Sequence, residues 1–332
     1  MCCRFSHTLR LTRRQVATWQ DVRVVITLRR LRVSPRPISI RSLALGVSAI
    51  IAVTALAGCS SSASNKGKQS VTTSGADAAV VAKVPAAIKS KGTIVVAADA
   101  SYAPNEFKDA NGNVIGMDAD LAQALGKVMG LKVSVVNASF DTIIPGLTAG
   151  HYDLGMSSFT DTKKREQTVD FVTYFSAGTS FFIKTGGPAI NSLADLCGHK
   201  VSVESGTTQQ DDAKTQSTAC TKAGKSKVTV EVYGTQTDAN LALSSGRADV
   251  SMADSPVAAY QVNQSSGKFA LSGQAYGTAP YGIAIPKGNG MAQAVLAALQ
   301  DLMTNGTYTQ ILTKWGIQSG AITNPAINGA TS

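Results

Sequence analysis

The sequence predicts an α/β protein made of two units that repeat one order of elements. From Gly92 onward, short apolar segments alternate with amphipathic helical ones, an order that requires a sheet covered by helices on both faces. The same order restarts at Ser180 without a long linker rich in Pro or Gly. Apolar residues make up 44% of the 332-residue chain, which is enough to give each unit its own core.

The first unit begins with an apolar strand, Thr93–Ala98, that leads into a polar loop over residues 99–113. A helix follows, with Asp118 expected as its N-cap and Gly130 at the position after its C-cap. A strand, a helical segment and another strand then complete the unit: residues 132–136, the stretch after Asp141, and residues 154–156.

The second unit repeats this alternation and is followed by two terminal helices. Two units without a long linker imply lobes joined by strand-like crossings, with a small ligand expected in the cleft between them. Strands are expected at 181–184, 200–203, 228–233, 250–252 and 281–286, and helices from Ser192 and at 208–219, 238–244, 255–261, 291–304 and 308–315.

The formal net charge of +10 is concentrated in the first 58 residues. Ten of the 31 basic residues and one of the 21 acidic residues, Asp21, lie there, so this leader carries +9 and the remainder +1. A nearly neutral remainder has no basic field with which to hold polyphosphate, so no nucleic-acid partner is expected.

The leader, residues 1–58, is expected to be a lipoprotein signal peptide. Its apolar run over residues 43–57 is shorter than the roughly 20 residues that a membrane-spanning helix needs. The run ends with Leu-Ala-Gly before Cys59, which resembles the bacterial lipobox and implies cleavage there, a lipid on the Cys59 thiol and anchoring at the outer face of the cell membrane. An ordinary signal peptide and a retained anchor helix remain alternatives.

The first part of the leader is longer than a usual basic region, which favours a start codon downstream of Met1. Arg29 and Arg30 then begin the basic region, and a twin-arginine export signal is the competing interpretation. Residues 59–83 are rich in Ser, Thr, Ala, Gly and Lys, so a flexible tether is expected there and folded sequence from near Val84.

Two cysteines, Cys197 and Cys220, remain in the exported part of the chain. An even pair in an oxidising compartment favours a disulfide. A metal site would need more ligands than these two cysteines and His199 supply, so no metal is expected.

Four segments resemble, in order and spacing, successive blocks of the family 3 solute-binding proteins, the polar amino-acid receptors of ABC importers. The resemblance runs from about residue 92 to 316, and its blocks are GMDADL at 116–121, IPGLTAGHYDL at 144–154, TDTKKREQTVDF at 160–171 and YGIAIPKG at 281–288.

This resemblance implies a two-lobed fold of the periplasmic-binding-protein type II class, with two hinge crossings. One lobe would comprise residues 84–177 and 279–332 and the other residues 178–278, with hinges near 174–178 and 277–281. It also implies a monomer without cofactors that binds a free L-amino acid and presents it to an ABC permease.

The resemblance further implies a ligand site. Arg165 matches the arginine that clamps the α-carboxylate of the ligand with both oxygens at once. Gly206, Thr207 and Thr208 match a loop at a helix N-terminus that favours an anion, and Asp254 matches the partner of the α-ammonium group. The ligand-binding residues expected in full are Asp99, Tyr102, Phe140, Ser157, Ser158, Thr160, Arg165, Glu204, Thr207, Thr208 and Asp254.

Among these residues, Glu204 occupies a position that differs among subfamilies. A pocket with Asp99, Glu204 and Asp254 would suit a second cation, which favours a basic or amide amino acid unless Glu204 points to solvent. Local sequence alone allows plainer interpretations, in which Arg165 lies on a solvated helical face and Asp254 only caps a helix.

No enzyme is expected, because the sequence has no Gly-x-Ser-x-Gly elbow, no Walker Gly-Lys-Ser/Thr and no His-Glu-x-x-His motif. Two alternatives within the same fold stay open. One is an extracytoplasmic dehydratase of the cyclohexadienyl or arogenate type, and the other is a ligand-sensing subunit of a receptor kinase.

Overall fold

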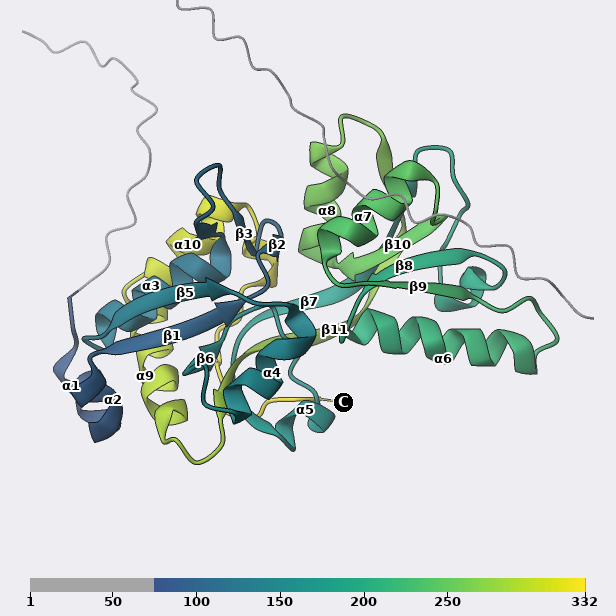
Figure 1. Ribbon diagram of the computed structural model, residues 1–332. Coiled ribbons are helices and arrows are strands. Elements are labelled where there is room, and N and C mark those ends of the chain that lie inside the picture. The colour runs from purple at the N-terminus through teal and green to yellow at the C-terminus, as the bar shows by residue number, and fades with distance from the viewer. Residues whose placement is uncertain (1–74, 332) are drawn as a thin grey trace, which may run out of the picture. The chain divides into compact units, whose positions relative to one another are not determined.

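The computed structural model describes residues 75–331 (Figure 1). The predicted leader, Cys59 and the tether up to residue 74 lie outside the described residues. Among residues 75–331 no helix is both long enough and apolar enough to cross a membrane.

Eight strands form one mixed sheet in the order β5-β1-β6-β11-β7-β10-β8-β9. Strand β1 pairs in parallel with β5 and β6, and β8 pairs in parallel with β9 and β10. Their bounds are β1 Thr93–Ala98, β5 Lys132–Asn137, β6 Leu154–Gly155, β7 Val169–Lys184, β8 Lys200–Glu204, β9 Thr229–Tyr233, β10 Val250–Asp254 and β11 Phe269–Pro286.

The long strands β7 and β11 carry the chain between two lobes. They pair antiparallel from Val169 opposite Pro286 to Lys184 opposite Phe269. We call lobe 1 the part that contains β1, β5 and β6, and lobe 2 the part that contains β8, β9 and β10. The register shifts three times between Ser272 and Gly282, and such irregularities bend and twist a ribbon locally. The predicted hinges, residues 174–178 and 277–281, fall in this stretch.

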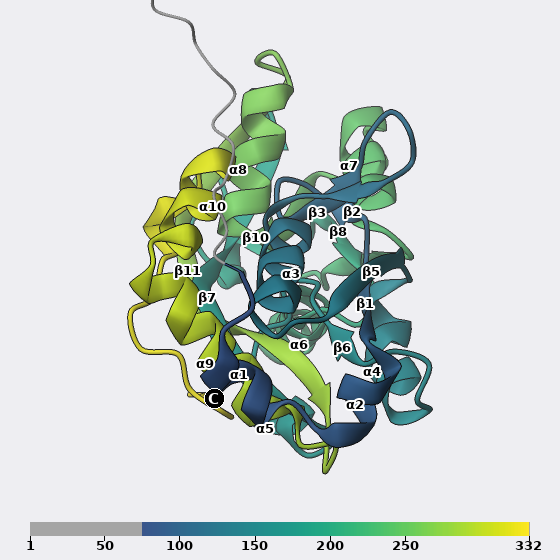
Figure 2. The ribbon, with the colours of Figure 1, turned by 90° about the vertical axis from the view of Figure 1, so that its left-hand side faces the viewer.

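Helices cover both faces of the sheet in each lobe (Figures 1 and 2). In lobe 2, Phe181 faces the cluster that contains residues of η1 and α6, whereas Phe182 faces the cluster of α7 and α8, as the alternation of a strand requires. The helices are α1 Ala78–Lys83, α2 Ala86–Lys91, α3 Met117–Val128, α4 Phe140–Thr148, α5 Lys163–Glu166, α6 Thr208–Lys222, α7 Gln236–Ser245, α8 Ser255–Gln264, α9 Met291–Thr304 and α10 Thr307–Trp315, with 3-10 turns η1 Leu193–Leu196 and η2 Gln318–Gly320.

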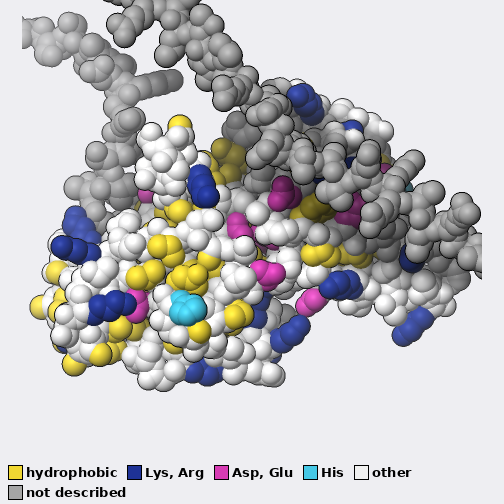
Figure 3. Space-filling model, viewed as in Figure 1, with side chains coloured by type: hydrophobic (Ala, Val, Ile, Leu, Met, Phe, Trp, Pro, Cys, Tyr) yellow, Lys and Arg dark blue, Asp and Glu magenta, His cyan; other side chains and the backbone are white. Residues whose placement is uncertain are grey.

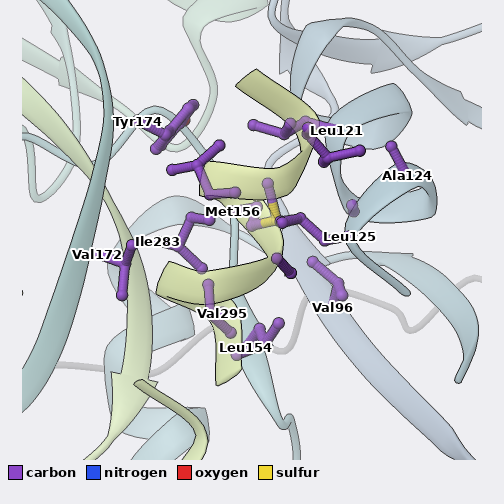
Figure 4. Packing of buried hydrophobic residues seen from close by; sticks show 14 of the residues in the cluster. Val96, Leu121, Ala124, Leu125, Leu154, Met156, Val172, Tyr174, Ile283 and Val295 are labelled. Carbon is purple, nitrogen blue, oxygen red and sulfur yellow. The ribbon is translucent and has the colours of Figure 1, made fainter. Parts of the chain in front are cut away.

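The main core of lobe 1 lies between the sheet and helices α3, α9 and α10. Leu121 and Leu125 of α3 and Val295 of α9 meet Val96 and Ile283 of the strands (Figure 4). All five side chains are almost fully buried, and burying one such side chain is worth about 1.5–3 kcal/mol. This packing holds α3, and with it the buried Asp118 of its first turn, in a fixed place behind the sheet.

The flexible tether was predicted to extend to residue 83, but residues 78–83 form helix α1, so this part of the prediction was wrong. Helix α1 begins at Ala78, where the Asp77 carboxylate accepts a hydrogen bond from the N–H of Val80. Val80 and Val84 are buried in the core of lobe 1. Two valines spaced by one helical turn therefore outweigh the small-residue composition around them.

Asp118 was predicted as the N-cap of its helix, and this was also wrong. Gly116 holds that position, with φ of 129°, and a Cβ there would overlap the carbonyl of Asn105, so only glycine fits. Asp118 lies in the first turn, is fully buried and accepts a hydrogen bond from the Tyr174 hydroxyl at 2.7 Å.

The predicted polar loop over residues 99–113 contains regular structure. A second sheet in the order β2-β3-β4 includes residues from this loop, with strands too short for any periodicity to show. Their bounds are β2 Ser101–Tyr102, β3 Glu106–Lys108 and β4 Val114–Ile115.

The other predicted strands and helices are present, most with slightly different ends. The strand 93–98 and the helix 291–304 coincide with β1 and α9, whereas the strands predicted at 181–184 and 281–286 are only the ends of β7 and β11. The predicted disulfide between Cys197 and Cys220 is present and ties η1 to α6. A loop of this size gives about 3 kcal/mol of stabilisation in the chain-entropy description.

Candidate ligand-binding site

A narrow cavity, with room for water-sized spheres of only about 10 Å³, lies between the two lobes. All eleven predicted ligand-binding residues line it, together with Glu106 and Gln209. Several of them lie at or just after the carboxyl ends of β1, β6, β8 and β10, where ligands bind in open α/β sheets. The sequence thus predicted a set of residues that the fold brings together around one space.

Arg165 of α5 reaches from lobe 1 to lobe 2. Its Nη1 donates to the Thr160 carbonyl at 2.8 Å, and its Nη2 donates to the Gly206 carbonyl at 3.0 Å. The guanidinium carbon lies 5.4 Å from the ring centroids of both Phe140 and Phe159. Burial lowers the pKa of Arg165 to about 10, so the group stays cationic at neutral pH. A guanidinium has five N–H groups, and those not used by the two carbonyls remain for an anion.

The N-terminus of α6 faces the same cavity from lobe 2. Thr207 is its N-cap and accepts a hydrogen bond from the N–H of Gln210, and Thr208 begins the helix. The first N–H groups of a helix have no partner within it and carry its positive dipole end. Arg165 and this helix end therefore form the anion-binding side of the cavity.

Asp254 supplies a negative charge from the end of β10. It holds the N-cap position of α8, yet its side chain makes no capping hydrogen bond. The carboxylate instead accepts from Gln209 Nε2 and from the Tyr281 hydroxyl, each at 2.7 Å. Burial raises the pKa of Asp254. The interpretation of Asp254 as only a helix cap is therefore wrong, because its side chain bonds to Gln209 and Tyr281 and does not cap α8.

Asp99 and Glu204 approach each other from opposite lobes. Both are buried, with exposed fractions of 4% and 2%, and Glu204 Oε1 has no hydrogen-bond partner among the described residues. Burial raises the pKa of both groups, and the charge of Asp99 raises that of Glu204 further. Glu204 does not point to solvent, and two buried carboxyl groups so close together, one of them with an oxygen that has no partner among the described residues, favour a cation.

Tyr102 links the lobes as well as lining the cavity. Its ring packs in the hydrophobic cluster of lobe 2 that contains Phe182 and Val257, and its hydroxyl accepts the N–H of Asp254 at 2.9 Å. Phe140 stacks on Phe159, with centroids 4.5 Å apart, beneath the guanidinium of Arg165. Both aromatic rings thus serve protein packing while presenting one side to the cavity.

Acidic side chains also gather on the outside of this region. Figure 3 shows them along the middle of one face, over the junction of the two lobes. Among the residues that line the cavity, four are acidic and Arg165 is the one basic group, so the electrostatic balance favours a ligand that brings positive charge. No metal-binding cluster of His, Cys, Asp and Glu is present among residues 75–331.

Two cavity residues were missed in the sequence. Gln209 follows the predicted Thr207 and Thr208, and its amide donates to both Asp254 and Thr179. Glu106 lies in the segment that was interpreted as a loop. Its place in the first turn of α6, directly after two predicted site residues, could have identified Gln209. Glu106 had no local signal.

Comparison with known proteins identifies the family. A model of the bacterial extracellular solute-binding proteins, family 3, matches residues 94–318. The arginine-binding protein ArgT of Corynebacterium glutamicum is 36% identical over 250 residues, which are 75% of this chain and 82% of that protein.

Solved structures give the same result. An ancestral arginine-binding protein bound to arginine has a TM-score of 0.64 with this fold, at 37% identity over 68% of this chain and 98% of that chain. An ancestral arginine-binding protein bound to glutamine has a TM-score of 0.63 at 36% identity, over 68% of this chain and 98% of that chain. These relatives are named as binding proteins and not as enzymes.

The buried Glu204 carboxylate predicts a pH-dependent stability. Its folded pKa is raised above the ordinary 4.5, so its contribution to stability is greatest below that pH and is lost as the pH rises towards the raised pKa. Glu204→Gln cannot ionise and should therefore unfold about 3 °C or more above the wild type at pH 8, but close to it at pH 4.5. Thermal unfolding after refolding from denaturant, which removes bound ligand, measures this.

Glu231→Gln is the matched control for that comparison, because Glu231 lies on β9 of the same lobe and is only partly buried. It should follow the wild type at both pH values. A Glu204→Gln variant with the same midpoint as the wild type at pH 8 would show that Glu204 finds a partner in solution.

Proposed function

The chain belongs to family 3 of the bacterial extracellular solute-binding proteins, and on this premise we propose that it binds L-arginine between its lobes. The observation that carries the proposal is the pair Asp99 and Glu204, two buried carboxyl groups from opposite lobes that meet at the cavity. The name of the relative from C. glutamicum, an arginine-binding protein, agrees with this chemistry.

One side of the cavity suits the α-carboxylate and α-ammonium groups. Arg165 and the N-terminus of α6 present N–H groups to an anion, and Asp254 presents a carboxylate to a cation. A planar guanidinium can engage both oxygens of a carboxylate at once. Because Arg165 comes from lobe 1 and Asp254 from lobe 2, a zwitterion would join the lobes and stabilise their closed arrangement.

The other side suits a second cation. A ligand guanidinium has a plane of N–H donors that can bridge two carboxylates, and Asp99 and Glu204 offer one carboxylate from each lobe. The same interaction would supply the partner that Glu204 Oε1 lacks in the protein. A neutral side chain of the same length would leave Glu204 Oε1 without a charged partner, which is costly in a buried site.

We also propose where this binding takes place. The small residues before Cys59 support processing as a lipoprotein, which would hold the protein at the outer face of the cell membrane. From there the closed complex would be presented to the transmembrane subunits of an ABC importer. The support is the lipobox resemblance together with the family, whose members bind solutes outside the cell.

A ligand panel tests the proposed function. L-arginine should raise the thermal midpoint of residues 60–332 by several degrees at a concentration about 100 times its Kd, where stabilisation is about 2.7 kcal/mol. L-citrulline, which has nearly the same shape but a neutral end, should bind at least tenfold more weakly in calorimetric titration. L-lysine, L-glutamine and prephenate complete the panel. Equal affinity for citrulline and arginine would contradict the role of Asp99 and Glu204, and consumption of prephenate would contradict a binding protein.

Replacing the predicted carboxylate clamp should reduce affinity far more than replacing its neighbour. Arg165→Ala should cost about 3 kcal/mol or more of binding, because it leaves a buried ligand carboxylate unpaired. Lys164→Ala is the control, since the Lys164 side chain is 84% exposed and forms only a long ion pair with Asp211. Near-normal affinity of Arg165→Ala in calorimetric titration would remove Arg165 from the site.

The anchoring proposal is tested at Cys59. Cys59→Ser should abolish lipid attachment, so the protein should move from the membrane fraction to the medium or periplasm of the expressing bacterium. A variant with Ser61→Ala is the control and should remain with the membranes. Continued membrane association of Cys59→Ser would mean that the apolar run of residues 43–57 is retained as an anchor.

A further inference from the structure

Two carboxyl groups lie against the wall of the cavity that Ser157 and Ser158 form, and one of them, Glu106, lines the cavity itself. Glu106 of β3 and Asp118 of α3 are both 0% exposed. Burial raises the pKa of both, that of Asp118 to about 6, and the neighbouring Asp118 raises that of Glu106 further. Two adjacent buried carboxylates do not both ionise, so the pair holds one proton and carries a single negative charge.

Both serine hydroxyls donate to this pair. Ser157 Oγ donates to Glu106 Oε1 at 3.0 Å, and Ser158 Oγ donates to Glu106 Oε2 at 3.2 Å. Asp118 Oδ2 lies 3.5 Å from the same Ser158 oxygen and is its second acceptor. A hydroxyl has one proton, so neither serine has an O–H left for a ligand.

Each serine oxygen also accepts one hydrogen bond from the protein. The N–H of Asp99 donates to Ser157 Oγ at 2.8 Å, and Asn105 Nδ2 donates to Ser158 Oγ at 2.9 Å. A hydroxyl oxygen has two lone pairs. One lone pair on each oxygen therefore remains, and both side chains line the cavity.

The backbone of Ser158 is turned away from the cavity as well. Its φ of 51° is left-handed, a conformation that is disfavoured for a residue with a Cβ. In this conformation its N–H donates to Asp118 Oδ2 at 2.8 Å. The same carboxylate that faces the serine hydroxyl thus also holds the serine backbone, and this hydrogen bond to a buried acceptor offsets the unfavourable φ.

We propose that Glu106 and Asp118 are positioning residues that hold Ser157 and Ser158 as hydrogen-bond acceptors, so that this wall of the cavity receives N–H groups of the ligand and rejects a carboxylate. The inference deepens the proposed function and rests on it. It assigns an orientation to the ligand, with N–H groups towards the serines and the carboxylate towards Arg165 and α6. It also predicts that amino acids with an acidic side chain are excluded.

Glu106→Gln tests the inference, because the amide keeps the size of the side chain but replaces one acceptor by an N–H₂ group. One N–H of the amide would face Ser158 Oγ and take its last lone pair, while the serine proton moves to its second acceptor, Asp118, so that this oxygen can no longer accept from a ligand. The Kd for L-arginine should rise at least tenfold. Tyr308→Phe, which removes another buried hydrogen bond of lobe 1, to the Tyr174 carbonyl, should leave Kd within twofold of the wild type.

A double-mutant cycle shows whether Glu106 acts through the serine. In the Ser158→Ala background, Glu106→Gln should change the Kd for L-arginine by less than threefold, because the hydroxyl that it reorients is absent. An equal loss in both backgrounds would mean a general structural role and would overturn the inference, as would an unchanged Kd in the single variant. If Glu106→Gln does not fold, Ser158→Ala alone should raise Kd at least fivefold, and an unchanged value would overturn the inference.

Failure of the proposed function gives a different result. Wild-type protein that binds L-glutamine but not L-arginine would overturn the arginine proposal only, and the same cycle run with L-glutamine would still test the serines, because every amino acid has an α-ammonium group. L-glutamate should show no binding to the wild type. Binding of L-glutamate as strong as that of L-glutamine would overturn the acceptor arrangement.

Discussion

The antiparallel pairing of β7 and β11 is the constraint on which the site depends. Two tyrosines lie where these strands cross between the lobes, with ring centroids 6.0 Å apart. Tyr174 donates to Asp118 of lobe 1, and Tyr281 donates to Asp254 of lobe 2, each at 2.7 Å. The strand register therefore fixes one buried carboxylate in each lobe, and a slip of either strand by one residue would turn its tyrosine hydroxyl to the other face of the sheet.

Collecting carboxylates around one cavity opposes folding, because a buried charge needs partners. The protein provides hydrogen-bond partners for some of these carboxylates and not for others. Asp254 has Gln209 and Tyr281, and Asp99 has the N–H of Phe140, whereas Glu204 Oε1 has none among the described residues. Such a local cost is typical of functional sites, where the surrounding structure holds an unfavourable arrangement in place. The uneven supply makes Glu204 the group with most to gain from a cationic ligand.

The sequence predicted strands and helices well where buried residues recur with the period of the element. It predicted them less well where a single tertiary contact determines where an element begins. Helix α9 has a continuous apolar stripe, so its ends could be predicted. The start of α3 could not, because the helix begins at a glycine that is required by the carbonyl of Asn105, a contact that exists only in the folded chain. Likewise, the eleven site residues could be predicted from family blocks, but Glu106 could not, because its partners Ser157 and Ser158 lie about fifty residues away in the sequence.

The charges that line this cavity favour some ligands over others. Arg165 and Tyr102 already join the lobes through contacts of the protein itself, to the Gly206 carbonyl and the N–H of Asp254. A ligand then adds to closure mainly by pairing charges that the protein leaves unpaired. Two independent features act in the same direction, since Glu204 offers a free carboxylate oxygen and the serine wall offers only lone pairs. Both features favour N–H donors of a ligand. An anionic group therefore fits only beside Arg165 and the N-terminus of α6. A ligand with one carboxylate and two cationic groups matches all of these positions.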